Sequence, residues 1–121
     1  MRTWVLVALA ALCLTGCPSK NKEQERLWGT WIGQGGVTME FSASGRIHML
    51  NPEGPTKDGT YIANFKTEPY ELDIRTDAKP ILTIFRFDSE GRLVVQSTEP
   101  GGIRPDEFDN GAVYFTRKPD R

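Results

Sequence analysis

Residue types that carry catalysis or bind metals are few in this sequence and lie far apart. His48 is the only histidine, so a zinc site would lack a second imidazole beside it. The same imidazole would have to act as the base for any serine nucleophile. The candidate serines, none of which lies in a nucleophile-elbow pattern, are Ser42, Ser44, Ser89 and Ser97. The sequence therefore predicts no catalytic residue, no metal site and no cofactor.

Two carboxylates lie close enough in the sequence to suggest an acid–base pair. Glu71 and Asp73 are separated by one residue, and they alternate with the apolar residues Tyr70, Leu72 and Ile74. In a β-strand this spacing places both carboxylates on one face and the apolar side chains on the other. We interpret the two acids as neighbours on a solvated strand face.

The most individual segment is a Pro/Gly-rich loop at residues 99–111, which exceeds the usual hairpin length of about two to five residues. Two interpretations remain open. In the first, the loop folds back over one end of the domain, with Arg104 paired to a carboxylate and Phe108 anchored in the core. In the second, the loop lines a ligand or partner site. Arg104 and Phe108 are then the candidate ligand-binding residues.

Short segments of alternating apolar and polar residues fill the sequence from Leu27 to residue 118. The alternation has the two-residue period of a half-buried strand, as in Val37, Met39 and Phe41. Glycines in residues 43–45 and 88–91 mark hairpin turns. The expected strands lie within residues 28–33, 37–41, 46–50, 59–65, 70–75, 81–87, 92–98 and 112–117.

Short turns between successive strands favour an antiparallel meander. Because open sheet edges invite aggregation, a meander of this many strands either closes on itself or packs as two sheets. The sequence therefore predicts an all-β fold, a small antiparallel meander of about eight strands in a closed or nearly closed barrel. A two-sheet sandwich is the alternative. An eight-stranded barrel has an interior just wide enough for its own side chains, so any mouth should be small.

The N-terminal segment has the pattern of a secretory signal. Arg2 precedes an apolar run at residues 4–14, which is shorter than the roughly 20 residues of a membrane span. The run ends in Leu14-Thr15-Gly16-Cys17, which resembles the lipobox of bacterial lipoproteins. The resemblance implies cleavage between Gly16 and Cys17 and lipidation of Cys17. The alternative is an ordinary signal peptide cut elsewhere, with Cys17 unmodified.

These patterns divide the chain into four parts. They are a signal peptide at residues 1–16, the lipidated Cys17 with a polar tether to residue 26, a β domain at residues 27–118, and a tail at residues 119–121. A helical turn is expected at the end of the tether, near residues 23–27. Removing the signal takes one basic residue from the 15 basic and 16 acidic residues of the chain, which leaves 14 and 16. This mildly acidic balance argues against a nucleic-acid partner.

The start of the β domain carries a second resemblance. Leu27-Trp28-Gly29-Thr30-Trp31 is similar to the G-x-W opening strand of lipocalin-like barrels. Further stretches, at residues 41–46, 58–61, 70–74, 84–87 and 99–108, look similar to short bacterial lipocalin-like domains of undefined function. The resemblance implies structural roles for Trp28, Gly29 and Trp31, with Trp31 packed across the closed barrel end and Gly29 allowing close approach. It assigns no ligand-binding residue.

Three classes of function follow, in decreasing order of support. The first is a non-enzymatic envelope lipoprotein that binds a small apolar ligand or an envelope protein, held to the membrane by its N-terminal lipid. The second is a structural or interaction lipoprotein with no ligand, and the third is an enzyme.

Neither Pro18 nor Ser19 is the Asp that resembles an inner-membrane retention signal. We therefore expect the outer membrane, facing the periplasm, in a cell with two membranes, and the outer face of the cell membrane otherwise.

Overall fold

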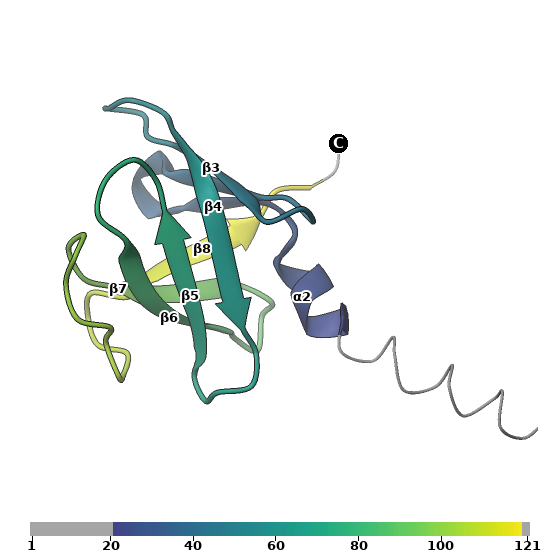
Figure 1. The fold of residues 1–121 in the computed structure, drawn as a ribbon. Coiled ribbons are helices and arrows are strands. Elements are labelled where there is room, and N and C mark those ends of the chain that lie inside the picture. Colours follow the sequence, from purple (N-terminus) through teal and green to yellow (C-terminus); the bar gives the residue numbers. More distant parts are fainter. Residues whose placement is uncertain (1–20, 120–121) are drawn as a thin grey trace, which may run out of the picture.

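The structure, a computed structural model, describes residues 21–119 as an eight-stranded antiparallel barrel with a short helix at one end (Figure 1). Each strand pairs with the next in sequence, and β1 closes the barrel by pairing with β8. The elements are α2 (Asn21–Leu27), β1 (Gly29–Gly33), the 3-10 turn η2 (Gln34–Gly36), β2 (Thr38–Phe41), β3 (Arg46–Leu50), β4 (Lys57–Asn64), β5 (Tyr70–Arg75), β6 (Ile81–Phe87), β7 (Leu93–Ser97) and β8 (Val113–Arg117). The predicted all-β closed meander is confirmed, and the two-sheet sandwich is excluded.

The strand directions give the barrel two distinct ends. Because β1 runs away from α2, the connections at residues 42–45, 65–69 and 88–92 gather at the same end as α2, which we name the closed end. The connections at residues 34–37, 51–56, 76–80 and 98–112 start from the opposite end, which we name the open end. In Figure 1 the β3–β4 connection rises at the upper left, away from α2.

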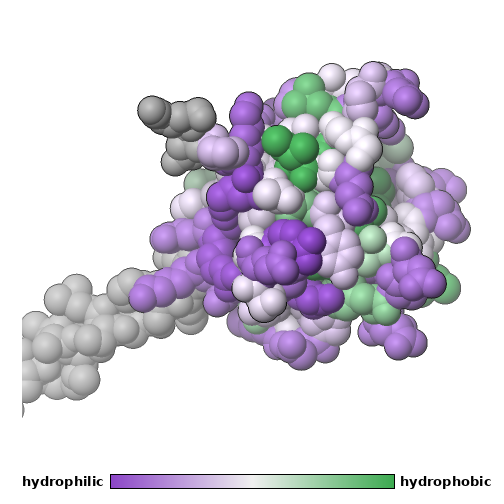
Figure 2. All heavy atoms as spheres, turned by 180° about the vertical axis from the view of Figure 1, so that it is seen from behind, coloured by the Kyte–Doolittle hydropathy of each residue, from purple (hydrophilic) through white to green (hydrophobic). Residues whose placement is uncertain are grey.

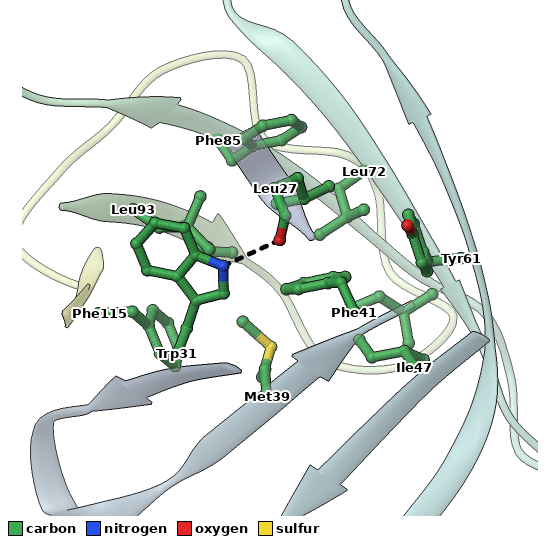
Figure 3. Close-up of a cluster of buried hydrophobic side chains, with 12 residues drawn as sticks. Leu27, Trp31, Met39, Phe41, Ile47, Tyr61, Leu72, Phe85, Leu93 and Phe115 are labelled. Atoms are coloured by element: carbon green, nitrogen blue, oxygen red, sulfur yellow. Dashed lines mark hydrogen bonds between the residues drawn. The ribbon is translucent and has the colours of Figure 1, made fainter. Parts of the chain in front are cut away.

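Inward-facing side chains of all eight strands fill most of the barrel (Figure 3). The buried core consists of Leu27, Trp31, Met39, Phe41, Ile47, Tyr61, Leu72, Ile74, Phe85, Leu93, Val95 and Phe115. These positions follow the two-residue period that the sequence predicts, since a strand alternates its side chains between interior and exterior. The face shown in Figure 2 is mostly hydrophilic, with apolar residues exposed near its top and at its lower right.

Helix α2 and Trp31 close one end of the barrel. Leu27, the last residue of α2, is fully buried, and its carbonyl accepts a 2.9 Å hydrogen bond from Trp31 Nε1 (Figure 3). The Arg117 guanidinium lies 4.4 Å from the Trp31 ring centroid and donates to the carbonyls of Trp28 and Arg26. Gly29 adopts φ +117°, and a Cβ there would lie 2.7 Å from Arg117 Nη1. Glycine is therefore required where β1 passes this guanidinium.

Helix α2 takes up residues that the sequence assigns to the tether. The expected helical turn near residues 23–27 exists, but the helix starts earlier, at Asn21. An i,i+3 ion pair of 3.3 Å between Glu23 and Arg26 supports it on the exposed side. Burial of Leu27 then fixes the helix to the barrel, because isolated helices of this length are unstable in water.

The connection at residues 98–112 lies along the outer wall of the barrel. Arg104 contacts β5 and β6, Phe108 stacks near Arg86, and the Asp109 amide donates to the Gln96 side chain. The expectation that this loop caps one barrel end is therefore wrong, whereas the expected pairing of Arg104 with a carboxylate is confirmed. The outward-facing residues Ile84 and Val94 are only 2% and 0% exposed, so β6 and β7 bury both faces. A small apolar layer outside the barrel thus holds the loop in place.

Candidate functional site

An apolar recess opens at the open end of the barrel. Its volume is about 150 Å³. It is lined by Met39, Met49, Ile74, Ile81, Thr83, Val95, Ser97, Val113 and Phe115. These residues come from six strands, β2, β3, β5, β6, β7 and β8. The recess is the part of the barrel interior that the core side chains leave empty.

The recess offers a ligand almost no polar contact. Thr83 is fully buried, and its hydroxyl already donates a 2.9 Å hydrogen bond to the Leu72 carbonyl. Its methyl group is therefore left for packing. Ser97, at the end of β7, is exposed and supplies the polar side chain of the rim. Met39 and Met49 face each other across β2 and β3, and such flexible thioether side chains adapt to irregular shapes.

The size of the recess limits what it can hold. Small-molecule pockets usually enclose about 300–1,000 Å³, and the recess has about 150 Å³. A dry apolar cavity of about 150 Å³ in another protein binds benzene or xenon. A single ring or the end of a short alkyl chain therefore fits, whereas a whole lipid does not.

A second hollow, of about 410 Å³, lies near the closed end, where the 98–112 connection meets the edge of the barrel core at Phe85. We name it the outer hollow. It is lined by Arg26, Glu68, Pro69, Tyr70, Phe85, Arg86, Phe87, Asp106, Glu107 and Phe108. The Arg26 guanidinium lies 4.2 Å from the Phe87 ring centroid, and that of Arg86 lies 5.1 Å from the Phe108 ring centroid. Because guanidinium groups already cover these rings, the hollow offers an apolar ligand less free surface than its volume suggests.

The two candidate ligand-binding residues lie away from the recess. Phe108 lines the outer hollow. Arg104 lies on the outer wall, where its Nη2 is 2.7 Å from Asp73 Oδ1 and its Nε is 3.8 Å from Glu71 Oε2. Its Nη1 also donates a 2.9 Å hydrogen bond to the Thr83 carbonyl. The structure therefore gives Arg104 three partners within the fold, and a ligand role for it or Phe108 stays a prediction.

Replacing Arg104 by methionine should release the loop and lower the free energy of unfolding by about 1–2 kcal/mol. This lies between the values for exposed and buried ion pairs, because the Arg104 and Asp73 side chains are each 24% exposed. Urea unfolding would measure the loss, and limited proteolysis would test the loop. Arg75→Met is the matched control. Arg75 is exposed on β5, the strand that carries Asp73, and it forms no ion pair among the described residues. Equal losses in both variants would contradict the prediction.

The other residues considered for chemistry do not converge on one site. His48 Nδ1 contacts Asp58 Oδ1 across β3 and β4 on the outer face. The Ser42 and Ser44 hydroxyls lie 2.9 Å apart and border the same shallow surface. Among the described residues, no hydrogen bond joins His48 to a serine. The His48–Asp58 pair has no local signal in the sequence, because it depends on the register of β3 with β4.

Two tyrosines near these features remain protonated donors at neutral pH. Burial raises the pKa of the Tyr61 phenol, which donates a 2.6 Å hydrogen bond to the Ser42 carbonyl. Burial, followed by the negative charges of Glu23 and Glu68, raises the pKa of Tyr70 at the edge of the outer hollow. Both phenols therefore act as fixed hydrogen-bond donors.

Comparison of the chain with family models, curated proteins and solved structures finds no match. Between residues 21 and 119, no group of three or more His, Cys, Asp or Glu side chains could hold a metal ion. Over the same residues, every helix is too short or too polar to cross a bilayer. Gly16 and Cys17, at the expected cleavage and lipidation site, lie outside the described residues.

Proposed function

We propose that this chain is a lipid-anchored, non-enzymatic protein of the cell envelope whose barrel binds one small apolar group. The observation that carries the proposal is the asymmetry of the barrel. Leu27, Trp31 and Arg117 close one end, whereas the other end opens on a recess lined almost entirely by apolar groups. Small-ligand sites are typically concave, mostly apolar and largely pre-formed, and they occur in the mouths of β-barrels.

The N-terminal sequence supports the location. The lipobox resemblance at Leu14-Thr15-Gly16-Cys17 supports lipidation of Cys17, and two or more acyl chains give stable anchoring. Pro18 and Ser19 follow Cys17, and neither is the Asp that resembles an inner-membrane retention signal. In a cell with two membranes this supports the outer membrane, with the domain facing the periplasm. Where it has one, the domain lies on the outer face of that membrane.

The geometry of the closed end supports the lipocalin-like interpretation. Trp31 is 1% exposed and spans the floor of the barrel, and Gly29 lets β1 approach Arg117 closely. These are the positions that the G-x-W resemblance implies for the two residues. Trp28 is half-buried, and its Nε1 has no hydrogen-bond partner among the described residues.

Methionine NMR tests binding directly, because Met39 and Met49 both line the recess. In lipid-free protein beginning at Lys20 and labelled with ¹³C-methyl methionine, benzene should produce saturable shifts of both signals. Val113→Phe should abolish them, since the larger ring fills the recess. Ile103→Ala is the control, because Ile103 is 87% exposed in the connection at residues 98–112. Shifts that persist in Val113→Phe would contradict recess binding.

A structural or protein-interaction lipoprotein with no ligand is the second candidate. The small volume of the recess, about 150 Å³, favours it, as do the ion pairs that hold Arg104 within the fold. The same titration separates the two candidates. If neither benzene nor xenon shifts the Met39 and Met49 signals of folded protein, the interaction lipoprotein is the better interpretation.

A further inference from the structure

Helix α2 joins the barrel to the proposed lipid anchor at a fixed place. Leu27 is buried in the core, and Arg117 donates hydrogen bonds to the carbonyls of Arg26 and Trp28. These contacts hold both the helix and its junction with β1 against the closed end. Figure 1 shows α2 at the lower right of the barrel. The residues that line the recess lie toward the opposite, open end.

The connection between α2 and Cys17 is short. Three residues, 18–20, separate Cys17 from Asn21, where α2 begins. Four Cα-to-Cα steps span at most about 14 Å, even when the chain is fully extended. The sequence alone suggested a tether through residue 26 with about twice this reach. Because residues from Asn21 onward form α2, only residues 18–20 remain to connect Cys17 to the helix.

The barrel is longer than this connection. Strand β4 has eight residues, and a strand rises about 3.3 Å per residue with a tilt of about 40° in a barrel, which gives roughly 20 Å along the axis. Laying the open end on the anchoring bilayer would place α2 at least this far above the surface. A reach of about 14 Å does not allow it.

We propose that the closed end faces the membrane that holds the anchor and that the recess opens away from it, into the aqueous space. This inference rests on the lipid anchor proposed above. It specifies the source of the apolar group, which must come from a molecule or surface on the aqueous side and not from the anchoring bilayer. The exposed residues of α2 carry both signs of charge, with Lys22 and Arg26 beside Glu25, so the short connection sets the orientation and no basic patch is required.

Fluorescence quenching on the mature, lipidated protein tests the orientation. Single cysteines replace exposed residues in Ser44→Cys at the closed end and in Glu53→Cys at the open end. Each thiol is labelled with a fluorophore, and the protein is reconstituted in phosphatidylethanolamine–phosphatidylglycerol vesicles that contain a headgroup-attached quencher. Given the roughly 20 Å between the two ends, quenching should be about twofold or more stronger at residue 44 than at residue 53.

A longer connection provides the matched control. Twelve Gly/Ser residues inserted after Lys20 add up to about 40 Å of reach, so the difference between the two positions should largely disappear. Equal quenching at both positions with the native connection, or stronger quenching at residue 53, would overturn the orientation on a protein that is still anchored. Mass spectrometry that finds no lipid on Cys17 would instead overturn the anchor, and the orientation with it.

Discussion

The Trp31→Ala variant is expected to lose about 3–5 kcal/mol of unfolding free energy, the usual loss for a fully buried large aromatic residue. Trp31 is 1% exposed, its Nε1 binds the Leu27 carbonyl, and the Arg117 guanidinium lies on its ring. The substitution therefore leaves a cavity in the floor of the barrel and detaches α2. Since small domains are stable by about 5–15 kcal/mol, the loss removes a large share of the stability and should lower the urea midpoint strongly. Circular dichroism with urea titration would measure the loss.

Two phenylalanine variants separate the hydrogen bond of Trp31 from its packing. Trp31→Phe keeps an aromatic ring but loses the donor to Leu27, whereas Trp28→Phe loses no hydrogen bond, because Trp28 Nε1 has no partner among the described residues. Trp31→Phe should therefore be more destabilising by about 1 kcal/mol or more. If Trp31→Ala unfolds cooperatively with a loss below about 1 kcal/mol, the floor of the barrel does not depend on this residue.

The strands and their order could be predicted from the sequence because their signals are local. Alternation in residues such as Val37, Met39 and Phe41 fixes which face of a strand is buried. Glycines at hairpin positions, such as Gly45 with φ +93° and Gly91 with φ +79°, fix where the chain reverses. With every connection short except one, a sequential meander was the simplest topology.

Features that depend on barrel closure could not be predicted. Arg117 reaches Trp31 only because β8 pairs with β1 in the register that sets these two residues opposite each other. Neither residue carries a sequence signal for the other. The same holds for His48 and Asp58, which meet through the β3–β4 register. Long-range pairing of this kind is a property of the closed sheet.

The position of the connection at residues 98–112 could not be predicted from the sequence for a different reason. Residues 81–87 are apolar at both odd and even positions, which indicates burial on two sides without showing what covers the outer side. The structure shows that residues 98–112 cover it and bury Ile84 and Val94. The recess was equally hidden, because its volume depends on how the core side chains pack and not on which residues face inward.

The Cys17→Ser variant is expected to lose lipid attachment completely, which is the largest effect on function that we predict. A serine hydroxyl is a much weaker nucleophile than a cysteine thiolate, so the diacylglyceryl thioether cannot form and the precursor should stay uncut before residue 17. Each buried methylene of an acyl chain contributes about 0.8 kcal/mol to membrane binding, and stable anchoring needs two chains or their equivalent. Metabolic labelling with a radioactive fatty acid and mass spectrometry would measure the loss.

Cys13→Ser is the matched control, because Cys13 lies within the expected signal peptide and its replacement should leave labelling and mature mass unchanged. Cys17→Ser protein found in the membrane fraction at the mature mass would show that the chain is anchored by another means.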